Sequence, residues 1–189
     1  MIFSDPQSGN VLLEQARRGD QDAISEIYRT FFPAIYKFVR LQVEDSQLAE
    51  DITGEVFFKF VDSVGKRHGP QNNVRAWLYQ VARNEIYRHF GKQRRLPTIA
   101  FDESFSVAAD MDLELQFLRS VEIERAQRAF RMLAADQQEV LILRFIEMLS
   151  LQETASVMNK STSAIKSLQF RAAASLRKLL EEARGAAHA

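Results

Sequence analysis

The stretch SLQETASVMNKSTSAIKSLQFRAAASLRKLL, residues 150–180, has the pattern of two helices separated by a short turn, and its second half is basic. Ser150 and Glu153 form a capping-box pattern ahead of the first helix, and Ser161 is placed to cap the second. Asn159 lies at the turn, where a left-handed backbone is often needed and asparagine tolerates one. Two helices joined in this way are typical of a helix-turn-helix.

The second helix of this stretch separates an apolar stripe from an outward face. The stripe consists of Ile165, Leu168, Ala172, Leu176 and Leu179. The remaining polar, basic and aromatic candidates for contacts with DNA are Ser163, Lys166, Ser167, Gln169, Phe170, Arg171 and Arg177. Lysine can contact phosphate or guanine, glutamine can pair with adenine, and an aromatic side chain can touch a thymine methyl group. The pattern favours DNA binding, and a plain helical hairpin with a solvated basic face is the alternative.

The composition favours a helical fold for the rest of the chain. The 189 residues are 46% hydrophobic and include only seven Gly and four Pro, fewer turn formers than strand-rich folds need. The chain has no Cys and three scattered His, so we expect no metal site and no cofactor. No apolar run approaches the roughly 18 residues of a membrane span, and the N-terminus lacks a signal-peptide pattern. We therefore expect a cytoplasmic protein.

Apolar residues at helical spacing predict three helices in the first half of the chain. They begin after Asp20, at Asp45 or Ser46, and at about Val74. Pro33 is expected to kink or interrupt the first of them.

The domain organisation follows from a break in this periodicity. Residues 96–115 are acidic and aperiodic, which predicts a flexible linker. We therefore expect an all-α protein with one small helical domain over residues 10–95 and a second over residues 116–184. Asp136 and Glu139 form a further capping-box pattern within the second domain.

The charges are strongly segregated although the net charge is zero. Residues 66–95 contain eight Lys or Arg and one acidic residue, and residues 160–189 contain six Lys or Arg and two acidic residues. Between them, residues 96–124 contain seven acidic residues and one Arg. Two basic blocks separated by an acidic block indicate two surfaces for a polyanion.

The first basic block includes a helix with aromatic and basic side chains on its predicted outward side. Its two outward rows are Tyr79, Arg83, Tyr87 and Gln80, Asn84, Arg88. Aromatic rings can stack on unpaired bases while arginines neutralise phosphates. The alternative is a surface helix whose tyrosine rings merely lie along the protein surface.

The preceding helix places Asp51, Glu55 and Phe58 on its outward side. A phenylalanine on an acidic exposed face indicates a contact with a partner. The alternative is that Phe58 packs under a neighbouring helix.

Three segments in this order resemble the extracytoplasmic-function (ECF) sigma factors of bacterial RNA polymerase. AEDITGEVFFKFVDSV (49–64) looks like region 2.2, NVRAWLYQVARNEIYRHFGKQRR (73–95) is similar to regions 2.3 and 2.4, and residues 133–180 look like region 4 with its LS.QE.A and IKS...RA...LRK pattern. The sequence departs from the family at Gly54, where glutamine is usual, at Lys160, where an apolar residue is usual, and at LQFR (168–171).

The resemblance implies that the chain binds core RNA polymerase at its clamp helices and flap. It also implies that the chain binds promoter DNA and that an anti-sigma factor controls it. Asp51, Glu55 and Phe58 would contact the clamp, and the outward residues of 163–177 named above would read the minus-thirty-five element. The residues implied for the opened minus-ten element are Lys66, Arg67, Asn73, Arg75, Tyr79, Gln80, Arg83, Asn84, Tyr87 and Arg88.

Two binding proteins of other kinds remain as alternatives. A helix-turn-helix regulator that does not act through polymerase would explain the C-terminal part, and a sigma-like decoy would bind an anti-sigma factor but no DNA. An enzyme is disfavoured because the sequence has no Gly-rich phosphate loop, metal-ligand spacing or nucleophile motif.

Overall fold

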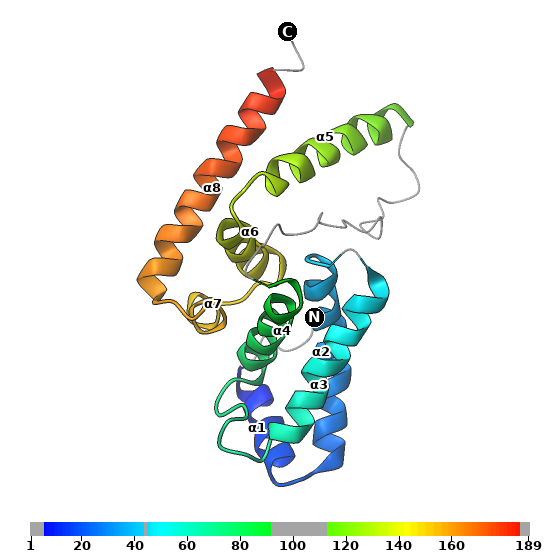
Figure 1. Ribbon diagram of the computed structural model, residues 1–189, viewed down its shortest axis with the longest axis vertical. Coiled ribbons are helices and arrows are strands. Elements are labelled where there is room, and N and C mark those ends of the chain that lie inside the picture. Colours follow the sequence, from blue (N-terminus) through cyan, green and yellow to red (C-terminus); the bar gives the residue numbers. More distant parts are fainter. Residues whose placement is uncertain (1–5, 44, 92–112, 186–189) are drawn as a thin grey trace.

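The computed structural model describes residues 6–43, 45–91 and 113–185, and every regular element in these ranges is helical, as predicted (Figure 1). The N-terminal helical unit contains α1 (Pro6–Arg17), α2 (Gln21–Arg40), α3 (Ser46–Ser63) and α4 (Val74–Phe90). The C-terminal helical unit contains α5 (Leu113–Arg131), α6 (Ala135–Leu141), the π-helical turn η1 (Ile142–Ile146), α7 (Leu151–Met158) and α8 (Thr162–Gly185). The predicted linker lies mostly outside the described residues, and α5 already begins within its last three positions.

The helix starts of the N-terminal unit follow from local capping. The Asp20 carboxylate accepts hydrogen bonds from the first turn of α2, and Asp45 does the same for α3. Asn73 caps α4 through a hydrogen bond from the Ala76 backbone N–H. Pro33 was predicted to kink or interrupt its helix; it does not interrupt it, because α2 runs through this residue.

The core of the N-terminal unit lies where α2, α3 and α4 meet. Its largest fully buried aromatic side chains are Tyr79, Phe38 and Phe60. Trp77 of α4 is partly buried and packs edge-on against Phe60, with ring centroids 6.2 Å apart, so it extends this core. The sequence did not predict α1, which adds Leu13 to this core.

The C-terminal unit contains the predicted helix-turn-helix in α7 and α8. The reciprocal hydrogen bonds of the Ser150–Glu153 capping box are present, at 3.1 Å and 2.8 Å, and Asn159 is left-handed (φ 52°, ψ 48°). Ser161 Oγ accepts from the Ala164 N–H and so caps α8. The capping box predicted at Asp136 is wrong: Ala134 is the N-cap of α6, and Asp136 lies in the first turn.

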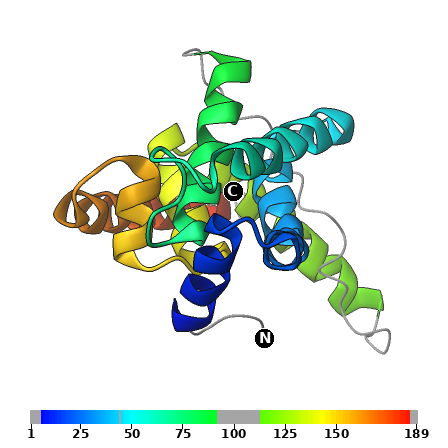
Figure 2. The same ribbon diagram turned by 90° about the horizontal axis from the view of Figure 1, so that it is seen from below.

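The two units contact each other through α4. This helix packs against α2 and α3 on one side and against α7 of the C-terminal unit on the other. Figures 1 and 2 show α4 between α3 and α7 in two perpendicular views. The contact decides which predicted site residues are accessible.

Candidate nucleic-acid interface

The outward face of α8 is exposed as predicted. Ile165 and Ala172 are fully buried and Leu168 is buried, and they fix the rotation of the helix against the rest of the unit. On the opposite side Phe170 is 77% exposed, and the other predicted DNA contacts of this helix surround it: Ser163, Lys166, Ser167, Arg171 and Arg177. A large apolar side chain in the middle of a polar helix face marks a surface that contacts another molecule.

Gln169 differs from its neighbours because a second side chain holds it. It is half-buried, and its Oε1 accepts a hydrogen bond of 3.1 Å from Arg144 Nε. The Arg144 guanidinium also donates to the backbone carbonyl of Leu149. The π-helical turn therefore positions one of the predicted base-reading side chains of α8.

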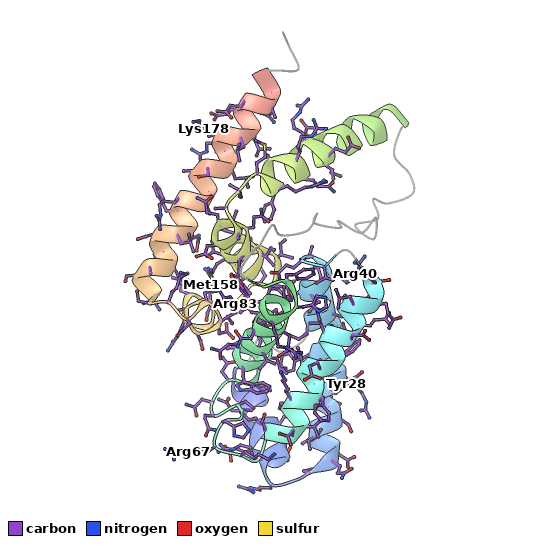
Figure 3. The ribbon with its side chains drawn as sticks, in the orientation of Figure 1. Tyr28, Arg40, Arg67, Arg83, Met158 and Lys178 are labelled. Carbon is purple, nitrogen blue, oxygen red and sulfur yellow. The ribbon has the colours of Figure 1, made fainter. Side chains whose placement is uncertain are left out.

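The second predicted DNA surface, on α4 and the loop before it, is only partly exposed. Lys66 and Arg67 of the loop and Asn84 and Arg88 of α4 are exposed, as is Asn73 at the start of α4. Figure 3 shows Arg67 in the loop at the far end of the N-terminal unit, away from the C-terminal unit. Lys66, Arg67, Asn84 and Arg88 can meet a nucleic acid in this conformation, whereas Asn73 is hydrogen-bonded to Glu153.

The other predicted minus-ten residues make hydrogen bonds to the C-terminal unit. Each of the following makes a hydrogen bond to α6, α7 or the segment after η1: Asn73, Arg75, Tyr79, Gln80, Arg83 and Tyr87. Arg75 donates to the backbone carbonyl of Glu147, and Gln80 donates to that of Ser156 at 3.4 Å. The sequence pattern placed these residues on one helix but did not indicate what covers them.

The prediction that Tyr79 is exposed is wrong, since its side chain is only 1% exposed. Its ring packs edge-on against Phe38, with centroids 5.1 Å apart, and its hydroxyl donates to Glu147 Oε2 at 2.5 Å. Burial raises the pKa of Tyr79 far above its ordinary value, and the neighbouring Glu147 carboxylate adds to this shift. A buried ring that packs in this way cannot stack on a base.

Arg83 forms the most enclosed ion pair between the two units among the described residues. Its Nε donates to Glu139 Oε1 at 2.7 Å, and the side chain of Glu139 is 0% exposed. The guanidinium also lies over the Tyr87 ring, 4.4 Å from the centroid. Burial of Arg83 disfavours its charge, but Glu139 outweighs this effect, so the pKa of Arg83 lies above its ordinary value.

Sequence reasoning did not predict the three glutamates that form the contact between the two units: Glu139, Glu147 and Glu153. Glu139 and Glu153 were assigned to capping boxes, and Glu147 was assigned no role. Glu153 does cap α7, and its other oxygen accepts from Asn73 Nδ2 at 3.2 Å. Glu147 is buried, and burial raises its pKa despite the hydrogen bond from Tyr79. A carboxylate on an otherwise apolar helix face was the signal in the sequence that such a residue has a buried partner. The partners themselves could not be identified, because they are distant in sequence.

The outward side of α3 forms a third predicted surface. Phe58 is 68% exposed, so it does not pack under a neighbouring helix, and Val61 beside it is also exposed. Asp51 is exposed and Glu55 is half-buried, where it pairs with Lys59 at 3.6 Å. The arrangement offers an aromatic side chain among carboxylates to a partner.

Two family models match the chain: Sigma-70 region 2 over residues 27–96 and Sigma-70, region 4 over residues 129–178. Over 172 residues the chain is 33% identical to the ECF RNA polymerase sigma factor BldN of Streptomyces coelicolor, covering 90% of this chain and 65% of that relative. The chain belongs to the ECF sigma factors. Its α1–α4 and α5–α8 units therefore contain regions 2 and 4 of a sigma factor.

Other relatives and solved structures agree with this assignment. The sigma factor is 29% identical to ECF RNA polymerase sigma factor SigX of Bacillus subtilis over 167 residues, which is 85% of each chain. CnrH, solved with the cytosolic domain of CnrY, has the same fold at a TM-score of 0.68 and 21% identity, covering 94% of this chain and 99% of that chain. RpoE of Bartonella quintana, solved with the anti-sigma factor NepR, matches with a TM-score of 0.56 and 27% identity, covering 83% of this chain and 96% of that chain.

Membrane-spanning and metal-binding features are both absent from the part of the sigma factor that the structure describes. Within these ranges none of the helices is long and apolar enough to cross a membrane. The same ranges contain no cluster of three or more His, Asp or Glu residues able to hold a metal ion.

Proposed function

We propose that this sigma factor binds core RNA polymerase and directs it to promoters, reading duplex DNA with α8 and holding opened DNA on α4. The observation that carries the proposal is the outward face of α8. Lys166 and Phe170 are exposed there, on a helix whose start is fixed by the Asn159 turn and the Ser161 cap. A rigid helix with exposed basic, aromatic and small polar side chains suits the major groove.

Two apolar surfaces support binding to the polymerase. Phe58 and Val61 on α3 are exposed, and we assign them to the contact with the clamp helices. A groove of about 770 Å³ lies between α5, η1 and α8, with Phe130, Phe145 and Leu176 in its walls. An apolar groove of this kind takes a hydrophobic segment of a partner, and we assign it to the polymerase flap.

On α4 the opened minus-ten strand contacts Asn84 and Arg88, and Lys66 of the preceding loop binds its phosphates together with Arg67. Arg83 and Tyr87 join this surface once the C-terminal unit has left it. The Tyr79 ring stays in the core, where it supports α4 against α2. The chain performs no covalent chemistry in this scheme, and the energy for melting comes from binding.

Control by an anti-sigma factor and a cytoplasmic site of action complete the proposal. The structurally similar RpoE of Bartonella quintana was solved with an anti-sigma factor, which supports a partner of that kind here. Core polymerase and promoters lie in the bacterial cytoplasm, and the sigma factor acts there.

The test is transcription with purified core polymerase on a library of randomised promoters. The sigma factor should select promoters with two separated conserved elements, and a Lys166→Ala, Phe170→Ala variant should lose selection at the upstream one. Binding to duplex DNA without binding to polymerase would indicate a plain helix-turn-helix regulator. Binding to an anti-sigma factor without binding to DNA would indicate a decoy.

A further inference from the structure

The face of α4 that the proposed function assigns to opened DNA is covered by the C-terminal unit. Figure 3 shows Arg83 where α4 meets the helices of that unit. The covering residues come from three successive elements: Glu139 of α6, Glu147 after η1, and Glu153 and Ser156 of α7. The contact thus extends along most of α4.

The chemistry of this contact resembles that of a nucleic-acid backbone. The C-terminal unit presents carboxylate and carbonyl oxygens to guanidinium, amide and hydroxyl donors of α4. Arg83 pairs with carboxylates and phosphates in the same geometry, so one guanidinium cannot serve both at once. Glu139 therefore occupies the position that a phosphate would need.

We propose that the C-terminal unit is an intramolecular cover for the DNA-binding face of α4, latched by the Arg83–Glu139 ion pair. The inference rests on the proposed function and adds its regulation: the free sigma factor is closed, and the minus-ten surface is complete only after the units separate. The exposed face of α8 is not part of the contact. Closure therefore covers part of one DNA surface and leaves the other accessible.

Glu139 is the latch because its charge is both enclosed and paired across the units. Removing one partner of an enclosed pair leaves the other charge uncompensated, which is far more costly than losing a surface pair. Glu182 of α8 provides a matched control. It lies 3.8 Å from Lys178 of its own unit, and both side chains are exposed.

A thiol reporter measures opening without any DNA, because the chain contains no cysteine of its own. Ala76 is buried on the same face of α4 as Arg83, two turns earlier, so Ala76→Cys should react with a thiol reagent only when the cover lifts. Ala49→Cys, in the core of the N-terminal unit, should react only on unfolding.

Glu139→Gln should accelerate labelling at position 76 about tenfold, the effect of losing one charge-assisted hydrogen bond. Glu182→Gln should leave the rate unchanged.

Equal labelling of Ala76→Cys with and without Glu139→Gln would overturn the latch. Equal acceleration at Ala49→Cys would also overturn it, because that result means unfolding rather than separation of the units. Arg83→Gln tests the pair from its other side and should give the same acceleration. The double variant should show no further increase.

A cleavable cross-link tests whether closure blocks function. Gln80→Cys and Ser156→Cys place two thiols across the contact, and a short bis-maleimide with a reducible centre should join them. With core polymerase and a promoter selected from the library, the joined sigma factor should melt less DNA than the same double variant before joining, and reduction should restore the level of that unjoined variant. Equal melting before and after reduction would overturn the cover. If the wild-type chain supports no transcription at all, the proposed function fails, while thiol labelling still reports on the latch.

Discussion

Phe58 and Tyr79 are both aromatic residues predicted on outward helix faces, and they have opposite environments. Phe58 is exposed among acidic side chains, whereas Tyr79 is buried between Phe38 and Glu147. Helical periodicity identifies which side of α4 Tyr79 occupies. It cannot show that a carboxylate 68 residues further along the chain meets that side.

Phe58→Ala should weaken binding to core polymerase without changing the stability of the sigma factor. An exposed aromatic anchor in an interface contributes roughly 2 kcal/mol or more, about thirtyfold in affinity, while its loss from the free protein removes little buried surface. Thermal melting and a polymerase-binding titration measure the two quantities.

Phe60→Ala provides the contrast two residues away on the same helix. Phe60 is fully buried and contacts Trp77, so truncation should cost about 3–5 kcal/mol of stability. If Phe58→Ala lowered the melting temperature as much as Phe60→Ala, the assignment of the outward face would be wrong.

Individual helices were predictable wherever their ends are determined locally. Asp20, Asp45 and Ser150 cap helices within three residues of themselves, and Asn159 takes the left-handed conformation its turn needs. The exposed face of α8 followed from its apolar stripe. The helix α1 was missed, because its apolar residues are few and its partners lie on other helices.

Replacing glycine by alanine should have opposite effects on stability at two positions. Gly54 lies inside α3, and an added β-carbon there would have nothing within 4 Å; Gly19 has the same open surroundings but a positive φ of 87°. Gly54→Ala should stabilise the fold by about 1 kcal/mol, whereas Gly19→Ala should destabilise it by a similar amount. Melting temperatures of the two variants decide this, and shifts of the same sign would contradict it.

Base readers and phosphate anchors on α8 should respond differently to mutation. Phe170→Ala should change which upstream bases are preferred, at about 1–3 kcal/mol for each lost base contact. Arg177→Ala, further along the helix, should weaken all sequences alike and reduce the salt slope by about one unit. A promoter-library profile of each variant at two salt concentrations measures both effects. Unchanged base preferences for Phe170→Ala would mean that α8 reads no bases there.

At the scale of the whole molecule, the sequence predicted two helical units and two DNA surfaces but not the way in which one unit covers the other. The decisive partners, Arg83 and Glu139, are 56 residues apart and belong to different units. Each also has a local explanation: Arg83 as an outward cation of its helix, and Glu139 as a capping residue. The contact depends on the three-dimensional arrangement of α4, α6 and α7, which no local pattern contains.

Glu147 should make closure dependent on pH. Burial raises its pKa above the ordinary value of 4.5, although Tyr79, Lys37 and Arg75 oppose the shift. A raised pKa means that protonated Glu147 favours the closed state, so this contribution is complete below about pH 4.5 and is lost as the pH rises through the closed-state pKa. Small-angle scattering from about pH 4.5 to about pH 8 should therefore show the free sigma factor becoming more extended.

Glu147→Gln should remove this dependence and keep the units together at neutral pH. The buried Oε1 of Glu147 has no hydrogen-bond partner among the described residues, so the carboxylate gains little to offset its desolvation. The variant keeps an acceptor for Tyr79 and carries no charge. A variant more extended than the wild type at neutral pH would show that the charge of Glu147 holds the units together.

The hydrogen bond from Arg144 to Gln169 restricts how this position can contact DNA. The Gln169 oxygen has two lone pairs and Arg144 engages one of them, so the amide keeps its two N–H donors and one acceptor direction for the major groove. Adenine recognition by glutamine uses the oxygen and the nitrogen together, and the contact with Arg144 fixes the orientation in which both are presented. Without Arg144 the amide can rotate and offer its donors and its acceptor in several orientations. Arg144→Ala should therefore weaken the base preference at the corresponding promoter position, which a promoter-library profile of this variant measures.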